Sequence, residues 1–137
     1  MRPLLIFLLF GMAVAACRQP DLITPDTLTG TWVEKSARQD TLIFNPTFQG
    51  QIRLNTLAVN RGKERNAGGY LTPKIGSGLY SYEIVENRIR VISMFSSSLR
   101  RSDYAVEQNG DALHLENFFE LGFNQPATAT RTLVRLP

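Results

Sequence analysis

The chain has 137 residues, of which 43% are hydrophobic and 20% are charged, a balance typical of one globular domain. This length leaves little room for a second domain. The formal net charge is only +3, whereas a nucleic-acid-binding protein usually carries a clustered basic excess. Composition therefore argues against nucleic acid as a partner.

The first 16 residues have the order of a signal peptide. Arg2 precedes an apolar run over residues 3–16, and this run ends in the small residues Ala15 and Ala16. The run is shorter than the roughly 20 residues that span a bilayer, and no second run of that length follows it. We therefore expect residues 1–16 to be a signal peptide and the mature protein to be exported.

The only cysteine, Cys17, directly follows Val14-Ala15-Ala16. This boundary resembles the lipobox of bacterial lipoproteins, although Val14 stands where leucine is commoner. The resemblance implies cleavage before Cys17, a diacylglycerol on its thiol and acylation of the new amino group. The alternative is a free cysteine in a signal that is uncleaved or cleaved elsewhere, but a lone thiol cannot form an internal disulfide. Because two or more acyl chains attach a protein stably to a membrane, we expect Cys17 to be the lipid anchor.

The residues after the cysteine suggest where the anchored protein resides. The residue after Cys17 is Arg18 and not an aspartate. By resemblance to enterobacterial sorting, this favours the outer membrane, on its periplasmic or surface face, over the inner membrane. Pro20 and Pro25 interrupt the next stretch, which has no periodic apolar pattern. We therefore expect residues 17–27 to form a tether between the lipid and the folded domain.

From residue 28 to the end, apolar and polar residues alternate in the manner of half-buried strands. Glu86-Asn87 and Asn109-Gly110-Asp111 each separate two alternating runs, as in antiparallel hairpins. We predict an all-β domain over residues 28–137, an eight-stranded antiparallel up-and-down barrel, because closure removes the exposed edges of an open sheet. The predicted strands are 30–36, 40–46, 48–57, 78–86, 88–96, 102–108, 112–118 and 129–136.

The chain carries short motifs in residues 28–32, 42–44, 82–84 and 111–115 and at Gly50. Together with Arg131 and Arg135 on the last predicted strand, these motifs resemble those of the small lipocalin-like lipoproteins of Bacteroidetes-type bacteria. In lipocalins, a Gly-X-Trp motif on the first strand lies at the closed end of the barrel, and an arginine of the last strand packs across the indole. The resemblance implies this structural role for Gly30, Trp32 and either Arg131 or Arg135, of which we favour Arg135. A guanidinium over an aromatic face contributes about 0.5–2 kcal/mol.

Alternation also predicts which side chains fill the barrel. An eight-stranded barrel is just wide enough to be filled by its own side chains or to hold one small ligand. We expect a filled interior, and the alternative is a cavity lined by Tyr80, Tyr82 and Tyr104. The predicted core consists of Phe48, Ile52, Leu54, Tyr80, Tyr82, Ile84, Ile89, Val91, Tyr104, Val106, Leu113 and Leu115.

Residues 59–77 form an irregular segment that is rich in glycine and basic residues. One interpretation is a solvated loop without a specific role. The other is a recognition loop in which Arg61, Lys63, Arg65 and Lys74 meet anionic lipid headgroups, phosphates or an acidic protein. We expect residues 60–76 to be dispensable for folding.

The sequence contains no recognisable catalytic or metal-binding constellation. His114 is the only histidine, and alternation places it on the face opposite Leu113 and Leu115. There is no His/Cys cluster for zinc and no glycine-rich phosphate loop, so we expect neither an enzyme nor a cofactor. Two functions remain. One is a lipid-anchored interaction module that binds an envelope protein or glycan, and the alternative is a carrier of a small hydrophobic ligand.

Overall fold

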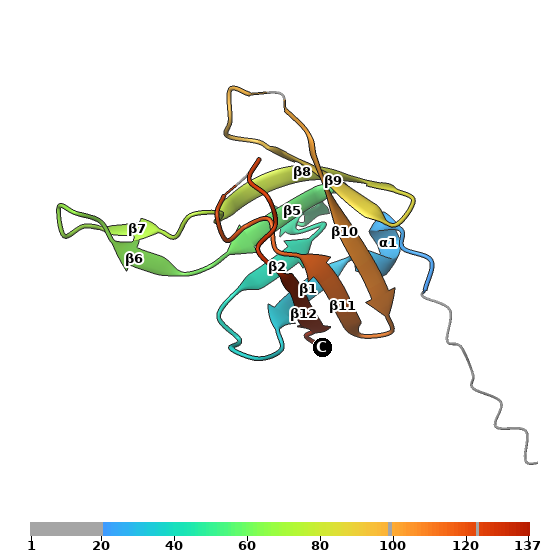
Figure 1. The fold of residues 1–137 in the computed structure, drawn as a ribbon. Helices are drawn as coiled ribbons and strands as arrows, with labels where there is room; N and C mark the ends of the chain where they lie inside the picture. Colours follow the sequence, from blue (N-terminus) through green and yellow to red (C-terminus); the bar gives the residue numbers. More distant parts are fainter. Residues whose placement is uncertain (1–20, 99, 123) are drawn as a thin grey trace, which may run out of the picture.

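The computed structural model describes residues 21–98, 100–122 and 124–137, so the expected signal peptide and Cys17 lie outside the described residues. Eight strands close into an antiparallel barrel, as predicted, and each pairs with its sequence neighbours in the barrel (Figure 1). The last of them pairs with the first and closes the ring. The barrel strands are β1 (Gly30–Glu34), β2 (Thr41–Phe44), β5 (Thr56–Asn60), β8 (Gly78–Val85), β9 (Arg88–Ser93), β10 (Ser102–Asn109), β11 (Ala112–Glu116) and β12 (Thr130–Arg135).

The up-and-down order sorts the connections between two ends of the barrel. The first end, called here the tether end, carries the helix α1 (Pro25–Leu28) and the connections 45–55, 86–87 and 110–111. The opposite end, called the long-loop end, carries the connections 35–40, 61–77, 94–101 and 117–129. Any surface built from the connections of the long-loop end therefore faces away from the point where residue 21 joins the barrel.

Period-two alternation decides which side chains enter the barrel. In β10, Tyr104 and Val106 are buried, whereas Asp103 before them and Glu107 after them are exposed and Ala105 between them is half-buried. In β11, Leu113 and Leu115 are buried, and the residues on either side of each are half-buried. Successive side chains of a strand point to opposite faces, so apolar residues at every second position line one continuous core.

The predicted strand 48–57 is wrong. The third barrel strand is β5, and a small hairpin of β3 (Thr47–Phe48) and β4 (Gln51–Ile52) precedes it outside the barrel. Gln49 and Asn55 have positive φ angles of 50° and 55°, so the chain turns twice within the predicted strand. Phe48, Ile52 and Leu54, which were expected in the core, are consequently 58%, 58% and 63% exposed.

A second hairpin replaces the irregular loop expected over residues 59–77. β6 (Lys63–Arg65) pairs with β7 (Leu71–Pro73), and this ribbon projects from the barrel at the left of Figure 1. We call residues 63–73 the arm. Both of its strands pair only with each other within the described residues. An isolated two-stranded ribbon is only marginally stable in water, so the arm depends on how its base is held.

Part of the expected tether belongs to the folded domain. The Asp21 amide donates to the carbonyl of Gln108 at 3.0 Å, and the Asp21 carboxylate accepts a bond from the Gly110 amide at 2.6 Å. Thr24 then caps α1, which is a single turn and too short to show a helical period in the sequence. Within residues 21–137, apart from the two gaps, no helix is long and apolar enough to cross a membrane.

Candidate functional site

The tether end of the barrel is closed by Trp32 and Arg135. Trp32 is fully buried, and its indole Nε1 donates to the carbonyl of Leu28 at 2.8 Å. Arg135 lies directly opposite Trp32 in the β1–β12 pair, and its guanidinium carbon is 4.4 Å from the centre of the indole. The same guanidinium donates to the carbonyls of Thr27 and Thr29. The arginine therefore ties the segment that includes α1 to the plug of the barrel.

Gly30, Trp32 and Arg135 come together, whereas Arg131 does not join them. Gly30 has a φ of +127°, which favours glycine, and a β-carbon there would lie in ordinary contact with Nη1 of Arg135, at 3.4 Å. Arg131 instead forms ion pairs with Glu34 at 3.2 Å and Glu120 at 3.4 Å. Arg131 therefore helps to fasten the long-loop end. Of the two arginines that the resemblance offered, Arg135 is the one that covers the ring.

The three candidate ligand-lining tyrosines are packed into the interior, and each is 4% exposed. Their hydroxyl groups are already engaged. Tyr80 donates to the Gly76 carbonyl at 2.8 Å, Tyr82 to Oδ1 of Asn45 at 3.0 Å, and Tyr104 to the Gln125 carbonyl at 3.1 Å. These residues therefore act as core side chains that satisfy polar groups at the barrel rims.

Burial keeps these phenols neutral. It is the largest cause of the raised pKa of Tyr80, Tyr82 and Tyr104. The pKa of Tyr82 rises to about 12, although the hydrogen bond to Asn45 opposes the shift. All three phenols therefore stay protonated to a higher pH than an exposed tyrosine does.

Two adjacent phenylalanines fill the interior at the long-loop end. Phe118 and Phe119 follow β11 and are both fully buried. The ring centre of Phe118 lies 4.9 Å from that of Tyr104 and 5.4 Å from that of Tyr80. Phe118 was predicted to end the strand 112–118, and alternation did not reveal this plug. A signal was present, because two consecutive large apolar side chains cannot both face the core from a regular strand.

The loop that carries the phenylalanines is fastened by Glu120. Its carboxylate accepts bonds from Nδ2 of Asn117 at 3.0 Å, from the hydroxyl of Thr128 and from Arg131. The hydrogen bond from Thr128 is the main reason why the pKa of Glu120 is lowered. Since one carboxylate joins both halves of the 117–129 loop, Phe118 and Phe119 are held inside the barrel mouth.

Arg61 holds the base of the arm and is not free to recruit a partner. Its side chain is only 15% exposed and pairs with Asp40 at 3.3 Å. Its Nη1 also donates to the carbonyls of Ile75 at 2.8 Å and Phe119 at 2.9 Å.

The other three predicted loop cations lie on the arm or directly after it. Lys63 and Arg65 are exposed on the arm and Lys74 is half-buried, while Arg65 donates to the Gly69 carbonyl within the arm.

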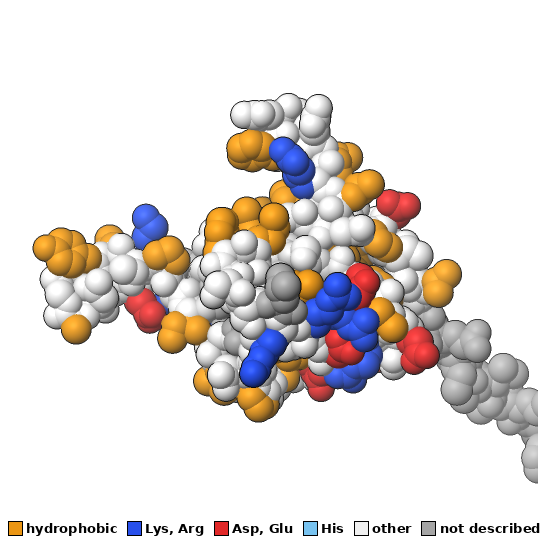
Figure 2. Space-filling model, turned by 90° about the horizontal axis from the view of Figure 1, so that it is seen from above, with side chains coloured by type: hydrophobic (Ala, Val, Ile, Leu, Met, Phe, Trp, Pro, Cys, Tyr) orange, Lys and Arg blue, Asp and Glu red, His pale blue; other side chains and the backbone are white. Residues whose placement is uncertain are grey.

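The long-loop end is both apolar and basic at its surface. Figure 2 shows apolar side chains on the arm and on the loop after β9, with basic side chains near them. The four connections at this end contain eight Lys or Arg and three Asp or Glu, a net charge of +5. The rest of the described chain contains five Lys or Arg and nine Asp or Glu, a net charge of −4. The exposed apolar residues here are Tyr70, Leu71, Ile75, Met94, Phe95 and Leu121.

The outer barrel wall carries His114, as alternation predicted. The imidazole is half-buried, and its Nδ1 lies 3.1 Å from the hydroxyl of Thr132 on the neighbouring strand. In the described part of the chain, no group of three or more His, Cys, Asp or Glu side chains is placed to hold a metal ion.

The chain matches no family model, no curated protein and no solved structure. The functional argument therefore depends on the barrel and its surfaces.

Proposed function

We propose that the protein is a lipid-anchored, non-catalytic interaction module of the cell envelope that binds an envelope protein or glycan through its long-loop end. The packed interior carries this proposal. Tyr80, Tyr104 and Phe118 occupy the part of the barrel where a ligand would otherwise sit. A barrel whose interior is filled can recognise partners only through its outer surface.

The proposed anchor gives the module an orientation. Cys17 precedes Asp21 by four residues, which span about 14 Å when fully extended. Because Asp21 is bound to the turn after β10, a lipid on Cys17 would keep the tether end close to the membrane. The long-loop end would then face away from that membrane. This arrangement suits capture of a partner from the periplasm or the cell surface, and the outer membrane is our proposed location.

We also propose that the chain is related to the small lipocalin-like lipoproteins that its sequence resembles. The antiparallel eight-stranded barrel and the contact of Arg135 with the buried Trp32 support this assignment. The proposed relationship concerns architecture. The binding specificity is assigned to the loops, which vary most readily on a rigid barrel.

The long-loop end has the chemistry of an interaction surface. Aromatic side chains and arginines contribute strongly to protein interfaces, and both are exposed here. Phe95 is 78% exposed and Tyr70 is 75% exposed. The net charge of this end favours an acidic partner and predicts binding that weakens as salt rises.

Capture from envelope extract tests the proposal. The full chain would be compared with a variant in which a short Gly-Ser link replaces the arm, and with Phe95→Ser. Phe48→Ser is the matched control, because Phe48 is equally apolar and 58% exposed but lies at the tether end. We expect a salt-sensitive partner that is lost from the first two variants and kept by the control. Undiminished capture by both test variants would place the binding surface elsewhere.

The alternative function, carriage of a small hydrophobic ligand, requires Phe118 and Phe119 to leave the interior. Their packing and the fastening of their loop by Glu120 argue against it. Titration with the fluorescent probe N-phenyl-1-naphthylamine distinguishes the two functions. Saturable binding that disappears when a Phe118→Trp substitution overfills the interior would favour the carrier.

A further inference from the structure

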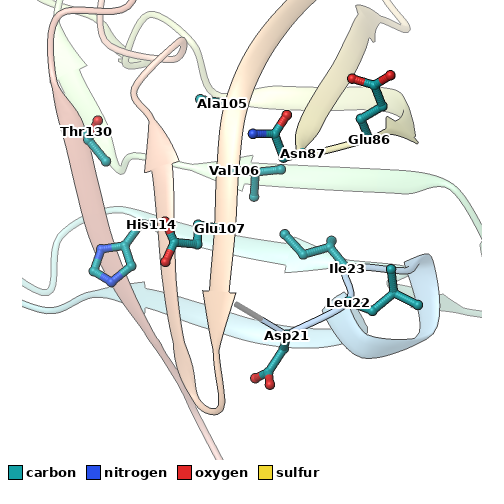
Figure 3. Close-up of a pocket in the computed structure, with 10 residues that line it drawn as sticks. All are labelled: Asp21, Leu22, Ile23, Glu86, Asn87, Ala105, Val106, Glu107, His114 and Thr130. Atoms are coloured by element: carbon teal, nitrogen blue, oxygen red, sulfur yellow. The ribbon is translucent and has the colours of Figure 1, made fainter. Parts of the chain in front are cut away.

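A groove of about 600 Å³ lies on the outer face of the barrel at the tether end (Figure 3). It arises from the local strand pairing. β9 begins at Arg88, which pairs with Ala105, so the remainder of β10 extends beyond β9. Two backbone bonds mark the limits of the gap. The Val106 amide donates to the Asn87 carbonyl at 3.1 Å, and the Asp21 amide donates to the Gln108 carbonyl at 3.0 Å.

The groove has an apolar wall and an acidic rim. Leu22 and Ile23 stand on one side in Figure 3, and Glu107 and His114 stand on the other. Glu107 lies directly opposite His114 in the β10–β11 pair, and both side chains are on the outer face. Among the ten described residues that line the groove, three are Asp or Glu and none is Lys or Arg. The ten are Asp21, Leu22, Ile23, Glu86, Asn87, Ala105, Val106, Glu107, His114 and Thr130.

The carboxylates of the groove retain unused acceptor capacity. Asp21 accepts one bond from the Gly110 amide, and Glu107 accepts one from Nδ2 of Asn109 at 2.9 Å. A carboxylate has about four acceptor positions, so each can accept further donors. Within the described residues, Asp21, Glu86 and Glu107 form no ion pair, whereas carboxylates elsewhere on the barrel are paired with arginines.

We propose that this groove binds a small organic cation with an apolar body, of the chemical class of a primary alkylammonium ion. An ammonium group has three donors and no acceptor, which matches a rim of carboxylates. The apolar body would pack against Leu22, Ile23 and Ala105, whose side chain is on the outer face of β10. The volume lies within the range of small-molecule sites. This site lies at the end opposite the surface proposed for the envelope partner, and it does not depend on that function.

Nuclear magnetic resonance on the ¹⁵N-labelled full chain in a zwitterionic detergent tests the charge requirement. The probe is hexylammonium, and hexanoate and hexanol are controls with the same alkyl chain. We expect saturable shifts of the Leu22, Ile23 and Val106 amides with hexylammonium alone. The proposal is overturned if hexanol or hexanoate produces the same shifts at the same concentrations, or if hexylammonium shifts no amide of the groove.

Substitutions locate the charge that is recognised. Glu86→Gln and Glu107→Gln keep the side-chain shape and remove one negative charge each. We expect hexylammonium to bind each about three- to tenfold more weakly, as when a charge-assisted contact is lost. Glu64→Gln on the arm is the matched control and should bind like the wild type. An unchanged affinity in the Glu86→Gln/Glu107→Gln double variant, with the native Trp32 fluorescence retained, would overturn the proposal.

Discussion

Gly76 passes so close to Phe119 that a β-carbon on the glycine would lie 1.9 Å from the phenylalanine carbonyl oxygen. Gly76 also has a φ of +83°, a conformation that other residues adopt only at a cost. The carbonyl of Gly76 accepts the hydroxyl of Tyr80, which itself packs against Phe118. The segment that follows the arm is thus joined to the aromatic plug of the interior.

This contact predicts that Gly76→Ala is strongly destabilising. The substitution combines a positive φ, which costs about 1–2 kcal/mol, with a backbone clash that shifts the plug. We expect a total loss of about 3 kcal/mol or more in urea unfolding. Gly62→Ala is the matched control, because Gly62 has a φ of +78° and nothing within 4 Å of its hypothetical β-carbon. Equal losses in the two variants would show that the clash is relieved without cost.

The contacts of Arg61 predict that the base of the arm is needed for stability while the arm itself is not. Arg61→Ala removes the donor from the exposed carbonyl of Ile75 and from the part-buried carbonyl of Phe119, and should cost about 1–3 kcal/mol. Replacing the arm with a Gly-Ser link should change the melting temperature little. This prediction modifies our expectation that all of residues 60–76 are dispensable. Thermal unfolding of the two variants checks it, and Arg65→Ala is the control for loss of a cation.

Alternation predicted the barrel because successive side chains of a regular strand point to opposite faces of the sheet, so the sequence alone indicates which residues point inward. The same rule placed Tyr104 and Val106 in the core and His114 on the outer wall. It failed for Leu54 because alternation continues through a hairpin that leaves the barrel, and nothing in the pattern marks the turn at Asn55.

The candidate sites were less predictable than the strands, because contacts between distant segments build them. The hydrogen bond from Arg61 to the Phe119 carbonyl joins two loops that are far apart in the sequence. The groove likewise exists only because Asp21 binds beside Gln108. Neither relationship has a periodicity or a motif. A charge such as that of Arg61 therefore looked available for recognition although it is already paired.

Trp32 is the only tryptophan, so its fluorescence reports directly on the plug at the tether end. It is fully buried, and we expect little quenching by acrylamide in the wild type. Arg135→Ala should increase the quenching and cost about 1–3 kcal/mol, because both the cation–π contact and the bonds to α1 and Thr29 are lost. Trp32→Ala should cost about 3–5 kcal/mol. Arg131→Ala is the control, because it removes an arginine of the same strand that does not cover the indole. If quenching in Arg135→Ala equals that of the wild type, Arg135 does not shield Trp32.

The proposed anchor predicts the mass of the mature protein. In the native host the N terminus should begin at Cys17 and carry lipid, which intact-mass spectrometry measures directly. Cys17→Ser should either be released from the membrane fraction or keep residues 1–16. A mature protein that begins at another residue and carries no lipid would contradict the anchor while leaving the groove and the long-loop surface untested by that result.

The buried tyrosines predict how stability depends on alkaline pH. The pKa of Tyr82 is raised from its ordinary value of 10.0 to about 12, chiefly by burial. Between these two values the unfolded chain has lost the phenol proton and the folded chain has kept it, so ionisation favours unfolding. The free energy of unfolding should therefore be constant as pH approaches 10 and should fall as pH rises toward 12. Tyr80 and Tyr104, whose pKa values are also raised by burial, add to the same slope.

Tyr82→Phe isolates the contribution of one phenol. Its stability at neutral pH should be lower, because Oδ1 of Asn45 loses the donor of a 3.0 Å hydrogen bond. Its loss of stability between pH 10 and 12 should nevertheless be shallower than that of the wild type, because one fewer phenol titrates differently in the two states. Urea unfolding at successive pH values measures both effects. Tyr70→Phe, at a position that is 75% exposed, is the control and should follow the wild-type slope. Parallel slopes for Tyr82→Phe and the wild type would mean that the Tyr82 phenol is not kept neutral by burial in the barrel.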